Sequence, residues 1–249
     1  MAQRRAAPTE GWCGSCQCAH TLPWAPAREA GLHLAQQLAE TQALPVDVGV
    51  GPSTEGLFGP SRGKMFGVLE AHDPRTGEAV TLRAFSGQYE GRWTVPGWVA
   101  PLFDVAQWHA TSEATEPGIK ALTREIDSLP SGDARRKLVA HRKAVSAQLM
   151  VDFHALYQLH NFSGRTLGLL AASLGDTLAT GTGDCCAPKL LNAAARRGLV
   201  PLGLAEFYWG ATNLSQTRQH QVFYSACDLK CGPILGHLLC GSGQPTSER

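Results

Sequence analysis

"GDCCAPKLLNAAARRGLVPLGLAEFYWG", residues 183–210, decides the fold that we expect. Its first part predicts a helix, in which Pro188 is acceptable in the first turn and Gly198 is the stop. Residues 200–209 are mostly apolar and predict a strand. The chain therefore places two adjacent cysteines, Cys185 and Cys186, at the start of a helix that leads directly into a strand.

A second stretch repeats this arrangement. "YSACDLKCGPILGHLL", residues 224–239, places Cys227 and Cys231 before the last predicted helix. The segment "QVFYSAC", residues 221–227, predicts the strand that leads to these cysteines. The remaining predicted elements are a helix over 27–41, a β-hairpin within 63–87 and a helical region over 118–160 that breaks at 130–132. We expect an α/β fold, with α+β as the alternative class, in which a mixed sheet carries helices on both faces.

The 249 residues suit one large domain or a domain with an insertion. We expect a cysteine-rich segment over residues 1–21 and a single α/β domain over 22–240. A helical insertion is expected over about 112–162, and a disordered polar tail over 241–249. The chain shows no internal repeat.

Composition restricts the partners and the compartment. The formal net charge of +1 gives no global field that would favour DNA or a membrane surface. No apolar run is long enough for a membrane span, and the charged N-terminus lacks the apolar region of a signal peptide. We therefore expect a cytoplasmic protein, and its oligomeric state stays open. In a reducing compartment, clustered cysteines indicate metal binding or catalysis more often than disulfides.

Seven of the eight cysteines lie in three short clusters. A thiol at a helix N-terminus lies near free N–H groups and the positive end of the helix dipole, which favours the thiolate. We predict a Zn²⁺ site formed by Cys186, Cys227 and Cys231, with Cys185 as the alternative to Cys186. Three protein ligands would leave a fourth position for water. The other interpretations are buried structural thiols or a nucleophilic cysteine.

Glu206 is a carboxylate in an otherwise apolar predicted strand. Desolvation would raise its pKa toward neutrality, as a general acid/base requires. Glu206 is therefore the candidate catalytic residue, and the alternative is an ion pair at the sheet edge with Arg196 or Arg218. His220 is a further candidate ligand, because it precedes the strand that leads to Cys227.

The N-terminal segment contains a second candidate metal site, with ligands from the set Cys13, Cys16, Cys18 and His20. The spacing C-x₂-C-x-C-x-H is too tight for all four residues to bind one ion comfortably. Three of them, or half a site that is completed elsewhere in the chain, would be easier to build.

The helical region carries a run of basic residues, namely Arg135, Arg136, Lys137, Arg142 and Lys143. Such a run usually forms a solvated helix face. The alternative is contact with the phosphates of RNA.

Several motifs resemble the N-terminal region found ahead of the catalytic domain in long RluA-type pseudouridine synthases. They are "GKMFGVL…AFSG", "GDCCAPKLL", "PLGLAEFYWG" and "FYSACDLKCGPILGHLL", and the resemblance runs from about residue 22 to residue 239. The His-Arg-Leu-Asp motif of the synthase domain does not occur in this chain. The resemblance therefore implies an association with RNA modification, and a non-catalytic module that binds RNA or a protein partner.

The order of the elements is also similar to the zinc-dependent cytidine deaminase fold, in which a cysteine pair opens a helix after the sheet. That resemblance implies a zinc-dependent, deaminase-like hydrolase that acts on a nucleobase, a nucleoside or a related heterocycle. Pro188 stands where the deaminase pattern has its glutamate, so Glu206 would have to take that role from another element. We favour the hydrolase, and the binding module is the alternative.

Overall fold

A four-stranded sheet forms the centre of the molecule. The computed structural model describes residues 6–60, 62–175 and 178–243. The strand order is β4-β3-β7-β8, and each of these neighbouring pairs is antiparallel. The strands are β3 (Lys64–His72), β4 (Ala79–Phe85), β7 (Val200–Trp209) and β8 (Phe223–Tyr224). The sequence predicts a strand over 221–227, but β8 is much shorter, because the residues after Tyr224 lead into the turn before the last helix.

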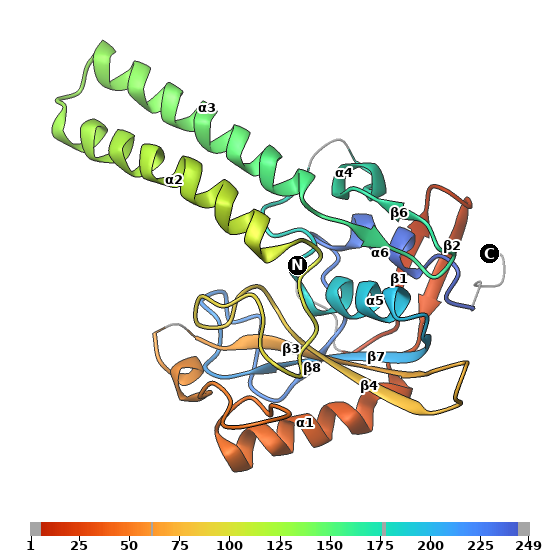
Figure 1. Ribbon diagram of the computed structural model, residues 1–249. Helices are drawn as coiled ribbons and strands as arrows, with labels where there is room; N and C mark the ends of the chain where they lie inside the picture. Colours follow the sequence, from red (N-terminus) through yellow and green to blue (C-terminus); the bar gives the residue numbers. More distant parts are fainter. Residues whose placement is uncertain (1–5, 61, 176–177, 244–249) are drawn as a thin grey trace.

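Helices cover both faces of this sheet (Figure 1). Helix α1 (Arg28–Thr41) packs on one face, and helix α5 (Cys186–Arg196) packs on the other. Side chains alternate between the faces of a strand, so Phe66 and Val68 join the α1 core, whereas Leu69 joins the α5 core. This arrangement confirms the predicted α/β class and the helices on both faces.

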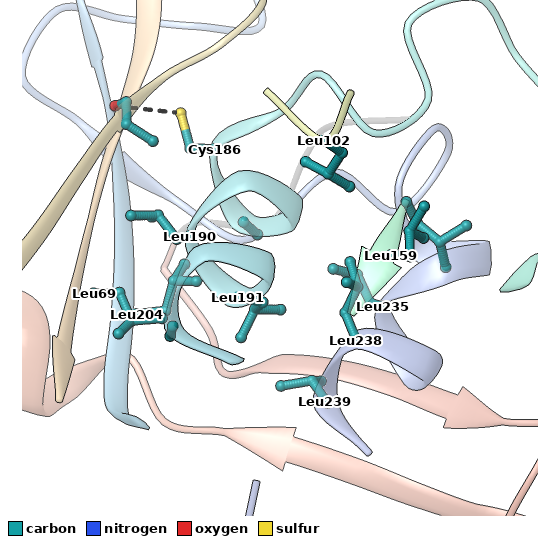
Figure 2. Close-up of a cluster of buried hydrophobic side chains, with 14 of the residues drawn as sticks. Leu69, Leu102, Leu159, Cys186, Leu190, Leu191, Leu204, Leu235, Leu238 and Leu239 are labelled. Carbon is teal, nitrogen blue, oxygen red and sulfur yellow. Dashed lines mark hydrogen bonds between the residues drawn. The ribbon is translucent and has the colours of Figure 1, made fainter. Parts of the chain in front are cut away.

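The core on the α5 face extends to helix α6 (Gly232–Leu239). Figure 2 shows α5 between the sheet residues Leu69 and Leu204 and the α6 residues Leu235 and Leu238. The buried α5 side chains include Leu190 and Leu191, which belong to the same hydrophobic cluster as these sheet and α6 residues. The two helices that begin next to cysteines are thus held in one hydrophobic cluster.

Helices α2 (Val105–Ser128) and α3 (Asp133–Ala155) form a long hairpin that projects from the sheet (Figure 1). The break between them matches the predicted one. Helix α2 nevertheless begins well before the predicted start at residue 118, because the Asp104 side chain caps it by accepting from the Gln107 N–H at 2.9 Å, and the helix continues through Pro117. The expected insertion over 112–162 covers most of this hairpin.

The N-terminal segment forms a β-hairpin that the sequence did not predict. Strands β1 (Thr9–Cys13) and β2 (Cys18–Leu22) pair with each other, and β1 lies against α6. The remaining short elements are β5 (Leu159–His160), β6 (Thr166–Leu167) and α4 (Leu169–Ala172). Of the expected disordered tail, residues 244–249 lie outside the described ranges. Among the helices of those ranges, none has the length and apolarity needed to cross a bilayer.

Candidate metal centre

Two helix starts meet on the α5 side of the sheet. Cys185 is the N-cap residue of α5, and Cys231 is the N-cap residue of α6. The Cys185 thiol lies near the thiols of both Cys227 and Cys231. The structure thus brings together three of the four cysteines that the sequence singled out here.

The turn from Cys227 to Cys231 directs backbone N–H groups inward. The Cys227 carbonyl accepts from the N–H groups of Cys231 and Gly232, at 3.1 and 2.9 Å, and the Lys230 N–H donates to the Cys227 sulfur at 3.5 Å. An N–H donor at the sulfur favours a thiolate at Cys227. The turn thus places the Cys227 residue beside the first turn of α6.

The pKa values of Cys185 and Cys227 are both raised. Hydrogen bonding to Cys227 lowers the pKa of Cys185, but hydrogen bonding to Cys231 and burial outweigh this effect and raise it well above its ordinary value. Hydrogen bonding with Cys185 and burial likewise raise the pKa of Cys227. A divalent cation among these sulfurs would reverse this preference, because it stabilises the thiolates. The donor chemistry therefore fits a thiophilic metal.

Cys186, the expected first ligand, lies elsewhere. Its thiol points toward the sheet (Figure 2). It donates to the carbonyls of Met65 and Ala84, at 3.4 and 3.7 Å. Cys185 has the extended backbone of the N-cap and Cys186 is the first helical residue, so the two side chains point in different directions. The structure places Cys185, the alternative, beside Cys227 and Cys231.

Glu206 lies on β7, facing the start of α5. Its side chain is 4% exposed, and its Oε1 accepts from the Ala187 N–H at 2.8 Å. Burial is the main cause that raises the pKa of Glu206 to about 8. No ion pair joins Glu206 to Arg196 or Arg218 in the described part of the chain. The carboxyl group caps α5 and is at the same time able to hold a proton near neutral pH.

Two charged residues that the sequence analysis missed lie beside this site. Asp184 precedes the cysteines and accepts from the Tyr157 hydroxyl at 2.7 Å, and burial raises its pKa. Lys189 is 1% exposed and donates to the carbonyls of Phe85 and Gly87, at 3.0 and 2.8 Å. A lysine among the apolar residues of "APKLL" was the signal that could have identified it.

The two C-terminal histidines have other contacts. His220 packs against the rings of Phe58 and Trp209, and its Nδ1 accepts from the Gly210 N–H at 3.1 Å. His237 is buried in α6, with its Nε2 3.0 Å from the Leu159 carbonyl oxygen. His220 therefore contacts the residues at the C-terminal end of β7.

A second group of ligand atoms lies at the N-terminal hairpin. This group consists of Cys13, Cys16, His20 and Cys240. Each residue offers one ligand atom, and these four atoms lie within 4.8 Å of one another, so the residues could bind a metal. No other group of three or more Cys, His, Asp or Glu residues in the described ranges is as close together. Cys18, which was part of the predicted set, is exposed, and its thiol donates to the Cys16 carbonyl at 3.3 Å. Cys240 takes the fourth place, so three residues of the N-terminal set are joined by one residue from the end of α6.

The basic run lies on α3. Arg135 donates to the Ile126 carbonyl at 3.3 Å, and Arg136 forms an ion pair with Asp133. Lys137 and Lys143 are exposed, whereas Arg142 is half-buried. Some of these basic side chains therefore bond within the α2–α3 hairpin, and others are exposed to solvent.

No protein-family model, curated protein or solved structure matches the chain.

Proposed function

We propose that this protein is a zinc-dependent hydrolase of deaminase type, with its reaction centre at Cys185, Cys227, Cys231 and Glu206. The observation that carries the proposal is that three thiols from two helix starts lie near one another and near a buried carboxyl group whose pKa is about 8. Catalytic zinc sites in proteins have three protein ligands and keep a fourth position open. The three thiols correspond to such a ligand set.

The sulfur atoms of this set lie less close together than those of the N-terminal group. Cys185 and Cys227 are half-buried, whereas Cys231 is fully buried. A small molecule would consequently reach the centre from the side of Cys185 and Cys227.

Glu206 supports a proton-transfer role. A general acid/base works best when its pKa lies near the operating pH. Glu206 could take a proton from water and give it to a leaving amino group, so that an amino group on a heterocycle is replaced by oxygen and ammonia leaves. When bound, the ion would supply Lewis acidity. The substrate class, a nucleobase, nucleoside or related heterocycle, follows from the resemblance to cytidine deaminases and remains part of the proposal.

The ligand set is tested by metal analysis of purified variants. We expect Cys185→Ser and Cys227→Ser each to lose one equivalent of zinc. Cys186→Ser is the matched control, because its hydroxyl would replace a thiol that bonds to the sheet, and it should keep all the zinc. Unchanged zinc in Cys185→Ser, or zinc loss in Cys186→Ser alone, would contradict the assignment.

The chemistry is tested with Glu206→Gln. The amide oxygen can still accept from the Ala187 N–H, so the fold and the zinc content should be retained. We expect ammonia release from a panel of amino-substituted nucleobases and nucleosides to fall by about a hundredfold or more. If the zinc-loaded wild type releases no ammonia from any member of the panel, the deaminase proposal is wrong.

The alternative is a module that binds RNA or a protein partner in the context of pseudouridine synthesis. It is favoured by the α2–α3 hairpin, which projects from the sheet and presents Lys137 and Lys143 to solvent. The triple variant Arg136→Gln, Lys137→Gln, Lys143→Gln should weaken binding to single-stranded RNA. It should also reduce the slope of log affinity against log salt by about 0.7 for each lost phosphate contact. Absence of RNA binding by the wild type at low salt would exclude the RNA-binding form of this module.

A further inference from the structure

The N-terminal ligand group joins two distant parts of the chain. Cys13 ends β1, Cys16 lies in the hairpin turn and His20 lies on β2, whereas Cys240 is the C-cap residue of α6. Cys13, His20 and Cys240 are 1%, 8% and 7% exposed. Four potential ligands, three of them buried, therefore surround one point where the hairpin meets α6.

The distances within this group match a tetrahedral ion. Two sulfur ligands about 2.3 Å from one Zn²⁺ are about 3.8 Å apart at the tetrahedral angle. The sulfur atoms of Cys16 and Cys240 are 3.7 Å apart, and the Cys16 sulfur is 3.1 Å from Nε2 of His20. The group thus has nearly the size that zinc requires.

The hairpin turn holds the ligand atoms of Cys13 and Cys16 close together. The Gln17 N–H donates to the Cys13 carbonyl at 2.9 Å, and Gln17 has the left-handed conformation with φ of 56°. This hydrogen bond and the left-handed residue form the tight turn between β1 and β2 that carries Cys16.

The backbones of the hairpin and of α6 are in direct contact. A Cβ atom on Gly11 would overlap the backbone of Gly236, and a Cβ atom on Gly236 would overlap the Trp12 carbonyl. Only glycine at both positions allows β1 to approach α6 so closely. This contact fixes the position of Cys240 relative to Cys13.

We propose that Cys13, Cys16, His20 and Cys240 bind one Zn²⁺ in a closed, four-ligand structural site that fastens the N-terminal hairpin to the end of α6. Three thiolates and one imidazole form a ligand set typical of structural zinc, and they leave no position for a substrate. The site is separate from the proposed reaction centre at the other end of α6, and neither proposal depends on the other.

The wild-type protein provides the first test. Cys16 and Cys18 are both exposed, so without a metal both should react with iodoacetamide. In the zinc-loaded protein we expect Cys18 to react at least tenfold faster than Cys16, and a chelator should remove the difference. Equal rates in the zinc-loaded protein would overturn the proposal. A peptide in which Cys16 is linked to Cys240 would also overturn it, because the short sulfur separation would then belong to a disulfide.

Variants separate this site from the reaction centre. Cys240→Ser and His20→Gln should each lose one equivalent of zinc that Cys185→Ser retains, whereas Cys18→Ser should retain all of it. Full zinc content in both Cys240→Ser and His20→Gln would contradict the structural site. If either variant fails to fold, the alkylation rates of the wild type still decide the question.

Discussion

Lys189 shows how a single buried charge is accommodated next to the candidate centre. Its ammonium group donates to two backbone carbonyls and lies 4.9 Å from the ring centre of Phe85 and 5.9 Å from that of Trp93. Burial nevertheless lowers its pKa to about 8. Its charged form is therefore stabilised less in the folded protein than in water.

This shift predicts a pH dependence of stability. Between pH 8 and 10.5, the ordinary lysine value, the unfolded chain binds more protons than the folded chain, so the free energy of unfolding should rise with pH. Lys189→Met removes this contribution. The stability difference, wild type minus variant, should therefore increase across this window by up to about 1.4 kcal/mol per pH unit.

The measurement is urea unfolding of both proteins between pH 7 and about 10.5, the ordinary lysine value. Lys137→Met, on the exposed part of α3, is the control and should give a constant difference from the wild type. A difference for Lys189→Met that is flat or falls with pH would show that the lysine is not perturbed as described.

At the scale of elements, two contacts position the helix starts. The sheet residue Gly67 lies opposite Glu206 in the β3–β7 register, and a Cβ atom there would be 2.7 Å from the Cys186 Cβ. Gly67 therefore allows the first turn of α5 to lie directly on the sheet, where the Glu206 carboxyl group can reach the Ala187 N–H. Both the packing of α5 on the sheet and the capping of α5 by Glu206 therefore depend on glycine at position 67.

Two helical glycines predict opposite effects on stability. Gly236 in α6 contacts the backbone of β1, so Gly236→Ala should lower the free energy of unfolding by about 2–3 kcal/mol. A Cβ atom on Gly118 in α2 would point into open space, so Gly118→Ala should raise it by about 0.5–1 kcal/mol. Urea midpoints at unchanged m-values would measure both effects. Equal effects of the two substitutions would contradict the close contact between β1 and α6.

At the scale of the whole molecule, the proposed structural zinc connects residues 224 positions apart, from Cys16 to Cys240. Its removal by a chelator should release the β1–β2 hairpin and expose part of α6. We expect faster amide hydrogen exchange in residues 9–22 and 232–239, while exchange in the α2–α3 hairpin stays unchanged. A uniform change over the whole chain, or none, would argue against a local fastening role.

Much of the architecture followed from local patterns. The helix over 27–41, the hairpin after residue 63, the helix after Cys185 and the strand containing Glu206 were predicted close to their observed positions. Local signals suffice there because amphipathic spacing, Pro188 and Gly198 act within one or two helical turns. The β1–β2 hairpin was missed because its strands are short and their stability comes from packing on α6, which no local pattern records.

The sequence by itself determined that cysteines stand at two helix starts and that a carboxylate interrupts an apolar strand. Only the tertiary structure decided that Cys185 rather than Cys186 turns toward Cys227 and Cys231, and that Cys240 rather than Cys18 joins the N-terminal ligands. The physical reason is the same in both cases. The backbone conformation at a helix start decides where each of two adjacent side chains points. The contact between β1 and α6 is set by long-range packing, so neither direction nor partner is encoded in local spacing.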